Sequence, residues 1–351
     1  MKNILILTHT DLDGFFSGAI CYEAAQKLLF RGEDKEITVK EWTYNYNLPS
    51  VDAIKKKYDA VIVADLMPDV NFMLALYDEN NPDYLTWFDH HVAPDEALEK
   101  AGGDKIKGLR TKEKKAGCMM AWKYYHPHEE PNFVLEMVSD YDAWNRDGVG
   151  ESVWENEVMP IFTYLDVHIK DWKDAILEME RCDNMMRDHT ILMYKKSILS
   201  EGKIIRNAKK SRFSRERSDG FEMLLHCIVC EGNESTPQEM ITEDYTPPYR
   251  NYRAFVVNTQ TRGSELFEDL YKSGLPGTDY DVFIVFNTTG KKWKYSMYTF
   301  KDDIACNTLM PVGIGPDGKG FLRFRGHKGA AGSVSDELML FDKTMENTEE
   351  I

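Results

Sequence analysis

Three features are scarce in this chain of 351 residues: long apolar segments, paired cysteines and an excess of basic side chains. No apolar run approaches the about 20 residues that cross a bilayer, which argues against a membrane-spanning protein. The N-terminal apolar run is short, and Asp11 and Asp13 follow it at once, so it predicts a first β-strand and not a signal peptide. We therefore expect a cytoplasmic protein with no membrane partner.

The six cysteines are scattered, and they do not form a disulfide framework. Cys227 and Cys230 make one C-x-x-C pair, but a structural zinc site needs more ligands than one pair supplies. Ordinary thiols are therefore the favoured interpretation of this pair.

The formal net charge is −16, which argues against a protein that coats long duplex nucleic acid through phosphate contacts. The charge is compatible with a nucleotide or short oligonucleotide held in a local basic pocket. The sequence leaves open whether the chain assembles with copies of itself.

The N-terminal part alternates between short apolar runs and amphipathic segments. The apolar runs cover 3–8, 60–65 and 84–89, and the helix-like segments cover 15–30, 48–58 and 70–80. Strands that alternate with helices predict an α/β fold with a parallel sheet.

The remainder of the chain changes character twice. Apolar residues at helical spacing predict a long helical connector, after which a β-rich pattern with one helix and one hairpin begins near residue 220. We therefore expect an N-terminal domain over 1–164, a connector over 165–217 and a smaller α/β domain over 218–351.

Acids and histidines gather where the apolar runs end. In a parallel sheet, ligands bind beyond the carboxyl ends of the strands, so these side chains are expected to meet. They are His9, Asp11 and Asp13 after the first run, Asp65 after the second, and Asp89, His90 and His91 after the third. A fourth segment, 132–144, is a helix or a strand that ends in Asp140 and Asp142.

Each of these acids has a simpler interpretation as a turn or helix-cap residue, and Asp13 could cap a helix that starts at Phe15. Their recurrence at four successive strand ends favours a shared metal site instead. Carboxylates mixed with imidazoles suit manganese, and several carboxylates with one bridging acid suit two ions.

The motifs HTDLDG, VADLMP, FDHH and SDYDAW resemble the four ordered motifs of the DHH phosphoesterase superfamily. RGHKGAAG resembles the Gly-Gly-Gly-His-x-x-Ala-Ala-Gly element of the DHH-associated C-terminal domain, although two of the three leading glycines are absent. The His-x-Asp-x-Asp-Gly spacing resembles the oligoribonuclease, or nano-RNase, branch.

This resemblance implies a two-manganese site, with magnesium as the alternative ion. One ion would be held by His9, Asp11 and Asp65, and the other by Asp13, Asp65, His90 and Asp140, with Asp65 bridging them. Asp89 would orient a histidine, and His91 would approach the substrate phosphate. SDYDAW offers two acids, and the end of the apolar run favours Asp140 over Asp142.

The resemblance also implies a phosphodiesterase that cleaves short oligonucleotides, with a C-terminal domain that binds the substrate. The residues carried over for this binding are Arg325, Gly326, His327, Lys328, Ala330, Ala331 and Gly332. The alternatives are an enzyme for cyclic dinucleotides or 3′,5′-bisphosphate nucleotides, a pyrophosphatase or polyphosphatase, and a non-catalytic nucleotide sensor. The basic stretch 203–217, with Phe213 interleaved, could guide a single strand, but a solvated helix face is favoured.

Overall fold

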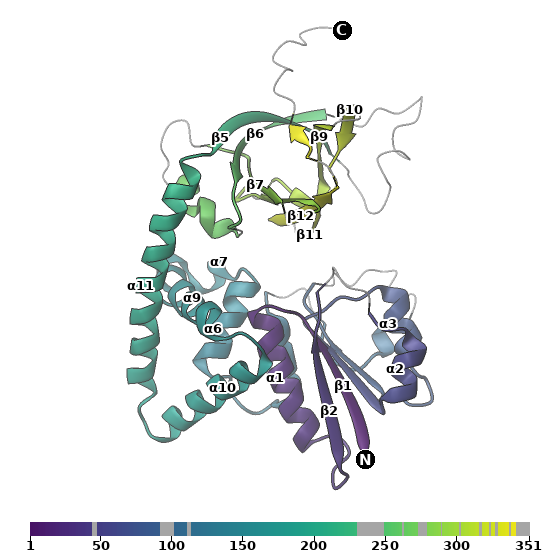
Figure 1. Cartoon of the computed structure of the whole chain (residues 1–351). Helices are drawn as coiled ribbons and strands as arrows, with labels where there is room; N and C mark the ends of the chain where they lie inside the picture. The colour runs from purple at the N-terminus through teal and green to yellow at the C-terminus, as the bar shows by residue number, and fades with distance from the viewer. Residues whose placement is uncertain are drawn as a thin grey trace. The chain divides into compact units, whose positions relative to one another are not determined.

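The structure is a computed structural model. It describes residues 1–43, 48–91, 102–110, 114–229, 249–261, 263–272, 279–288, 290–301, 303–315, 318–322, 324–326, 329–336 and 338–341. The chain divides into two compact units, Met1–Asn207 and Ala208–Ile351 (Figure 1). Among the described residues, no helix combines the length and the apolar character that crossing a bilayer requires.

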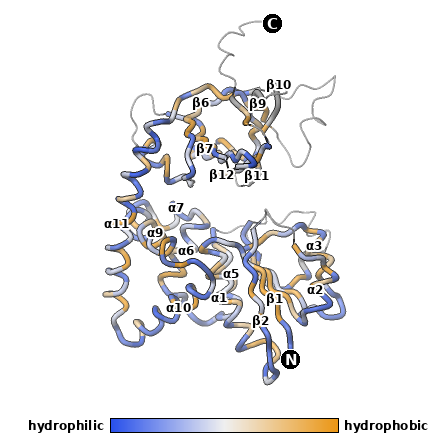
Figure 2. The backbone as a smooth tube through the Cα atoms, viewed as in Figure 1, coloured by the Kyte–Doolittle hydropathy of each residue, from blue (hydrophilic) through white to orange (hydrophobic). Residues whose placement is uncertain are grey.

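The first unit is built on a four-stranded parallel sheet of order β2-β1-β3-β4. Its strands are β1 (Lys2–Thr8), β2 (Lys35–Glu41), β3 (Ala60–Ala64) and β4 (Leu85–Phe88). The central strands are apolar on both faces, as is typical of a parallel sheet covered by helices on both sides. Figure 2 shows this as the orange colour along β1.

Helices cover both faces of this sheet. On one face Leu5, Leu7 and Val63 pack with α2 (Val51–Lys57) and α3 (Val70–Leu76). On the other face Ile4 and Ile62 pack with the remaining helices. These are α1 (Leu12–Lys27), α5 (Gly117–Tyr125), α6 (Phe133–Asp142), α9 (Met159–His168) and α10 (Trp172–Arg187). Shorter elements are η1 (Gly103–Lys105), α7 (Arg146–Val149), α8 (Glu151–Val153) and the π-helix η2 (Trp154–Val158).

The helical segment 165–217 does not form a separate compact unit. α10 packs against α1, and its Ala175, Met179 and Cys182 are buried in the same core as the sheet. α11 (Ile191–Arg217) begins in the first unit and continues past the unit boundary at residue 207. The helical character of 165–217 is therefore as predicted, while most of the segment belongs to the first unit.

The second unit is a nine-stranded mixed sheet of order β10-β9-β5-β6-β7-β8-β12-β11, with β13 paired to β9. Its strands are β5 (Phe221–Val229), β6 (Tyr249–Asn258), β7 (Val282–Thr288), β8 (Trp293–Tyr298), β9 (Leu309–Gly315), β10 (Gly318–Phe321), β11 (Arg325–Gly326), β12 (Ala330–Ser335) and β13 (Leu340–Phe341). β6 and β7 are parallel, and η3 (Ser264–Phe267) and α13 (Glu268–Lys272) lie between them in sequence. β7 and β8 form the predicted hairpin, and η4 (Cys306–Thr308) precedes β9. The α/β fold class is thus confirmed in both units.

Candidate metal centre

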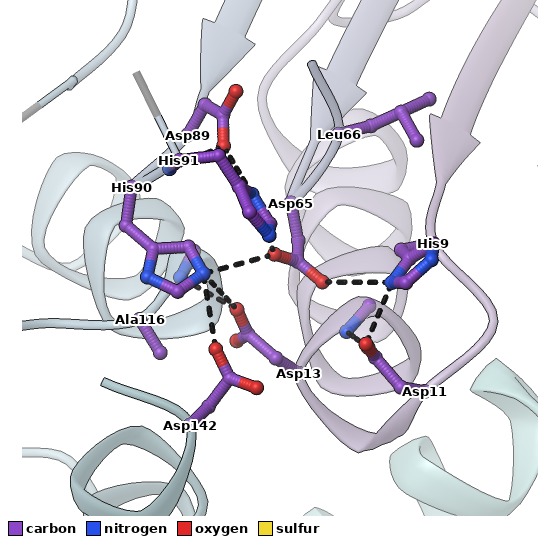
Figure 3. Close-up of polar contacts among 12 residues, drawn as sticks. His9, Asp11, Asp13, Asp65, Leu66, Asp89, His90, His91, Ala116 and Asp142 are labelled. Atoms are coloured by element: carbon purple, nitrogen blue, oxygen red, sulfur yellow. Dashed lines mark hydrogen bonds and ion pairs between the residues drawn. The ribbon is translucent and has the colours of Figure 1, made fainter. Parts of the chain in front are cut away.

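The site residues lie at the carboxyl edge of the first sheet (Figure 3). His9 follows β1, Asp65 follows β3, and Asp89 to His91 follow β4. The fourth segment is a helix, α6, and Asp142 is its last residue. Of the two interpretations left open for this segment, the helix is the correct one, and the fourth motif follows a helix and not a strand.

His9 and Asp11 form one side of the cluster. His9 Nδ1 lies 2.6 Å from Asp11 Oδ2 and 4.0 Å from Asp65 Oδ2. The other oxygen of Asp11 accepts a hydrogen bond from the Gly14 amide at 2.9 Å and so caps α1. Asp11 is therefore a helix cap and a member of the cluster at once, because a carboxylate has lone pairs for both tasks.

Asp13 is buried in the first turn of α1 and is held by the start of another helix. Its two oxygens accept hydrogen bonds from the Gly117 amide (2.7 Å) and the Cys118 amide (2.8 Å) at the N-terminus of α5. These unpaired amides and the helix dipole stabilise a negative charge there. The alternative that Asp13 caps α1 is wrong, because Asp11 takes that place.

The contact with Asp13 requires glycine at position 117. A β-carbon there would lie 2.8 Å from Asp65 Cβ and 3.1 Å from Asp13 Oδ2, closer than such atoms normally approach. Sequence reasoning missed Gly117 and Cys118 as site residues. The available signal was a glycine that directly precedes an apolar helical run.

Asp65 lies at the centre of the cluster. Its backbone adopts a left-handed conformation with φ of 51°, which is uncommon for a non-glycine residue and is typical of functional sites. Its side chain is 1% exposed, and both carboxylate oxygens are buried without a hydrogen-bond partner among the described residues. Burial of an ionised carboxylate is costly, so a bound cation would stabilise the charged form of Asp65.

His90 and Asp142 form the other side of the cluster. His90 Nε2 lies 3.0 Å from Asp142 Oδ2, 3.4 Å from Asp65 Oδ1 and 3.8 Å from Asp13 Oδ2. This nitrogen therefore faces three carboxylates, and Asp142 is the nearest of them. Figure 3 shows this group on one side of Asp65 and His9 with Asp11 on the other.

Asp140 occupies a different position from the one expected. Its Oδ1 accepts a hydrogen bond from Asn145 Nδ2 at 2.9 Å, and its carbonyl accepts one from the Asn145 amide. Of the two acids in SDYDAW, the structure therefore brings Asp142 and not Asp140 to His90. The reason is helical geometry: two residues along a helix is about 200° of rotation, so only one of the two acids can face the sheet edge.

His91 is turned toward Asp89. Asp89 Oδ1 lies 2.8 Å from His91 Nδ1 and accepts a hydrogen bond from the His91 amide at 3.0 Å. Asp89 is fully buried, so this contact sets the orientation of the imidazole ring. The geometry is compatible with the roles that the resemblance implies for both residues.

The electrostatics of the cluster favour bound cations. Burial, together with the charges of Asp13 and Asp11, raises the pKa of Asp65 well above its usual range. Burial lowers the pKa of His90, but Asp142 and Asp13 outweigh this effect and raise it to about 9. These shifts show that the clustered carboxylates create a negative potential, which a bound cation would offset.

Three overlapping groups have ligand atoms within 4.8 Å of one another. They are His9, Asp11 and Asp65; Asp13, Asp65, His90 and Asp142; and Asp65, His90 and His91. Ligands on opposite sides of one divalent ion lie about 4.4 Å apart, given bonds of about 2.2 Å. The residues present therefore fit divalent cations, with Asp65 shared by all three groups.

No protein-family model and no curated protein matches the chain. Among solved structures it is similar to exonuclease RecJ bound to manganese, with 15% identity, a TM-score of 0.45, and 95% of this chain and 86% of that chain covered. It is also similar to the pGpG-specific phosphodiesterase PggH from Vibrio cholerae (11% identity, TM-score 0.40, 95% and 93% covered). A third is an exopolyphosphatase-related protein from Bacteroides fragilis (10% identity, TM-score 0.37, 95% and 86% covered).

The predicted substrate-binding element lies in the second unit and is described in part. β11 pairs with β12 so that Arg325 is opposite Gly332 and Gly326 is opposite Ala331, with Ala330 at the start of β12. His327, Lys328 and the side chain of Arg325 lie outside the described residues. The binding role of this element stays a prediction.

The basic stretch on α11 is largely tied into the protein. Phe213 is buried in the core of the second unit, so its ring is not available to stack on a base. Arg206 pairs with Glu155 at 2.8 Å, and Arg217 pairs with Asp269 at 3.5 Å. These contacts favour the structural interpretation of the stretch. Cys227 is buried in the sheet, and Cys230 lies outside the described residues.

Proposed function

We propose that this chain is a two-metal phosphodiesterase of the DHH superfamily that hydrolyses short oligonucleotides, as nano-RNase-type exonucleases do. One observation carries the proposal: the buried carboxylate of Asp65 has no hydrogen-bond partner among the described residues and faces two ligand groups. Its Oδ2 points toward His9, and its Oδ1 points toward His90 (Figure 3). A carboxylate so placed is suited to bridge two cations.

His9, Asp11 and Asp65 would hold one cation, and Asp13, Asp65, His90 and Asp142 would hold the other. This is the set that the resemblance implies, with Asp142 in place of Asp140. The mixture of imidazole and carboxylate suits manganese better than magnesium, which prefers oxygen ligands alone. When bound, such ions stabilise negative charge on a phosphate and lower the pKa of water.

The remaining residues of the site bind and orient. Asp89 holds Nδ1 of His91, and we assign the other ring nitrogen of His91 to a phosphate oxygen of the substrate. In the hydrolysis the oxygen of a water molecule forms a bond to phosphorus and the water gives up a proton. The phosphorus–oxygen bond to the leaving nucleoside breaks, and the leaving oxygen takes up a proton. The site needs no protein nucleophile for this reaction.

A panel of substrates tests the proposal and separates it from the alternatives. Short RNA, short DNA, a cyclic dinucleotide, a 3′,5′-bisphosphate nucleotide, pyrophosphate and polyphosphate would be incubated with the full chain and manganese. We expect cleavage of short oligonucleotides, loss of cleavage on chelation and recovery on adding manganese. Cleavage of pyrophosphate or polyphosphate alone would overturn the substrate assignment, and full activity in excess chelator would overturn the metal site.

Two neighbouring acids provide a matched pair of variants. Asp65→Ala should abolish cleavage and reduce bound manganese, because this carboxylate lies in every ligand group. Asp69→Ala, in the same loop, removes an exposed cap of α3 and should leave cleavage near that of the wild type. Near wild-type turnover by Asp65→Ala would show that the site is assigned wrongly.

The second unit is proposed to bind the substrate through Arg325 and its neighbours. Arginine has no acceptor for a cation, but its guanidinium matches a phosphate. Arg325→Ala should therefore raise KM for an oligonucleotide and leave the manganese content unchanged. A loss of bound manganese in this variant would contradict the role.

A further inference from the structure

Trp144 lies two residues beyond Asp142, the acid that faces His90. The residue is 44% exposed, although tryptophan is a large apolar residue that normally buries most of its surface. None of the roles assigned above uses this ring.

The backbone at Trp144 makes this exposure more informative. The Trp144 amide donates to the Tyr141 carbonyl (3.0 Å), and the Asn145 amide donates to the Asp140 carbonyl (2.8 Å). These two bonds end α6 in a Schellman motif, whose left-handed position usually holds glycine. Here that position is Trp144, with φ of 49°. A partly exposed tryptophan thus occupies a position where the backbone favours glycine, so helix termination does not account for it.

The ring is nevertheless held in place. It packs edge to face on Trp154, with centroids 5.2 Å apart and the planes at 67°, and on Tyr141 at 6.3 Å and 68°. Trp154 is fully buried at the start of the π-helix η2, and π-helical turns are frequent at functional sites. A partly exposed aromatic ring on a fixed aromatic support has little side-chain freedom left to lose when a ligand binds.

We propose that Trp144, two residues beyond Asp142, stacks on a nucleobase of the substrate. This inference rests on the proposed function and deepens it. An indole ring carries no charge that would attract phosphate, but it stacks on any base with little regard to sequence. The residue would therefore distinguish nucleotides from pyrophosphate and polyphosphate, which have no base.

The test uses a pair of ligands that differ only in the base, AMP and ribose 5-phosphate. Binding of each to the full chain would be measured by calorimetry with manganese present. We expect the wild type to bind AMP about tenfold more tightly, a ratio typical of one base–aromatic stack. In Trp144→Ala the ratio of the affinities for AMP and ribose 5-phosphate should fall close to one. In Trp144→Phe most of the preference for AMP should remain.

Two further variants separate a lost stack from a lost fold. Trp144→Gly removes the ring and supplies the residue that this helix end prefers. The variant should therefore stay folded and lose the preference for AMP over ribose 5-phosphate. Trp172→Ala is the matched control, because the Trp172 ring contacts Tyr22, with centroids 4.6 Å apart and the planes tilted at 42°. Tyr22 lies about 15 Å along α1 from the first residue of that helix. This control should keep the wild-type ratio.

The outcomes distinguish this inference from the proposed function. No preference for AMP in the wild type, or an unchanged preference in Trp144→Ala, would overturn the stacking. A preference that depends on Trp144 in a chain that cleaves no phosphodiester would support the stacking and overturn the proposed function. Equal weakening of both ligands in Trp144→Ala would show a structural role and also overturn the stacking.

Discussion

Replacing each of the two acids at the end of α6 by asparagine is the most discriminating perturbation of the metal centre. Asp142→Asn and Asp140→Asn each remove one negative charge, two residues apart, without changing side-chain volume. Asp142 Oδ2 lies 3.0 Å from His90 Nε2, whereas Asp140 Oδ1 accepts a hydrogen bond from Asn145. An amide oxygen can still accept that bond, so Asp140→Asn should preserve the helix end.

The expected size of the difference follows from the charges. At an effective dielectric of about 20, a unit charge about 4 Å from a divalent ion contributes about 8 kcal/mol, most of which desolvation offsets. Loss of a group that merely supports a ligand already weakens metal binding by about 10- to 100-fold. We therefore expect Asp142→Asn to weaken one manganese by at least about 100-fold, and Asp140→Asn to weaken neither by more than about threefold.

The assay is a calorimetric titration of each metal-free variant with manganese at one pH, followed by hydrolysis of a diribonucleotide. Asp142→Asn should retain one of two binding events and lose most of its turnover. Wild-type binding by Asp142→Asn together with impaired binding by Asp140→Asn would refute the assignment and return the ligand role to Asp140.

Three further outcomes are expected. Asp65→Asn should raise the Tm of the metal-free protein by a few degrees, at about 2–4 °C per kcal/mol of stability. The reason is the raised pKa of Asp65, which means that its charged form costs stability as pH rises above the ordinary carboxyl range. A lower Tm of the variant in thermal unfolding with chelator would contradict this. The affinity for manganese should rise about tenfold per pH unit between pH 7 and 9, because His90, whose pKa is about 9, must lose its proton to bind; a flat profile in calorimetric titrations would contradict it. Gly117→Ala should weaken manganese binding, because its methyl group would lie 2.8 Å from Asp65 Cβ and overpacking costs about 1–3 kcal/mol. Gly18→Ala, in which the nearest contact is the Thr8 methyl at 3.1 Å, should change it little.

The parallel sheet could be predicted because its inner strands are continuous apolar runs, as in 4–7 and 60–64. β2 was missed for the opposite reason. Its sequence KEITVKE is charged at both ends, and as an edge strand it buries little of its surface. The packing of α10 into the core of the first unit could not be predicted, since helical periodicity shows which face of α10 is apolar but not which core that face enters.

Most of the candidate site could be predicted because its members follow strand ends, where the chain direction alone brings them together. The choice between Asp140 and Asp142 could not be made that way, since it depends on the rotation of α6 about its axis. The contact of the Gly117 and Cys118 amides with Asp13 was missed for a related reason. A glycine before an apolar helical run is a signal for a helix start, but it does not name the partner of a backbone donor, and this contact spans about a hundred positions of chain.

The most direct test of the account is the number of manganese ions bound per chain, measured on the metal-free full-length protein in parallel with cleavage of a diribonucleotide. The account predicts two ions in the wild type, with cleavage that appears only as the second site fills. It predicts fewer than two ions and no cleavage in Asp65→Ala, because no other side chain belongs to all three ligand groups. Cleavage by a protein that binds no divalent ion, or two tightly bound ions in Asp65→Ala, would contradict the central claim.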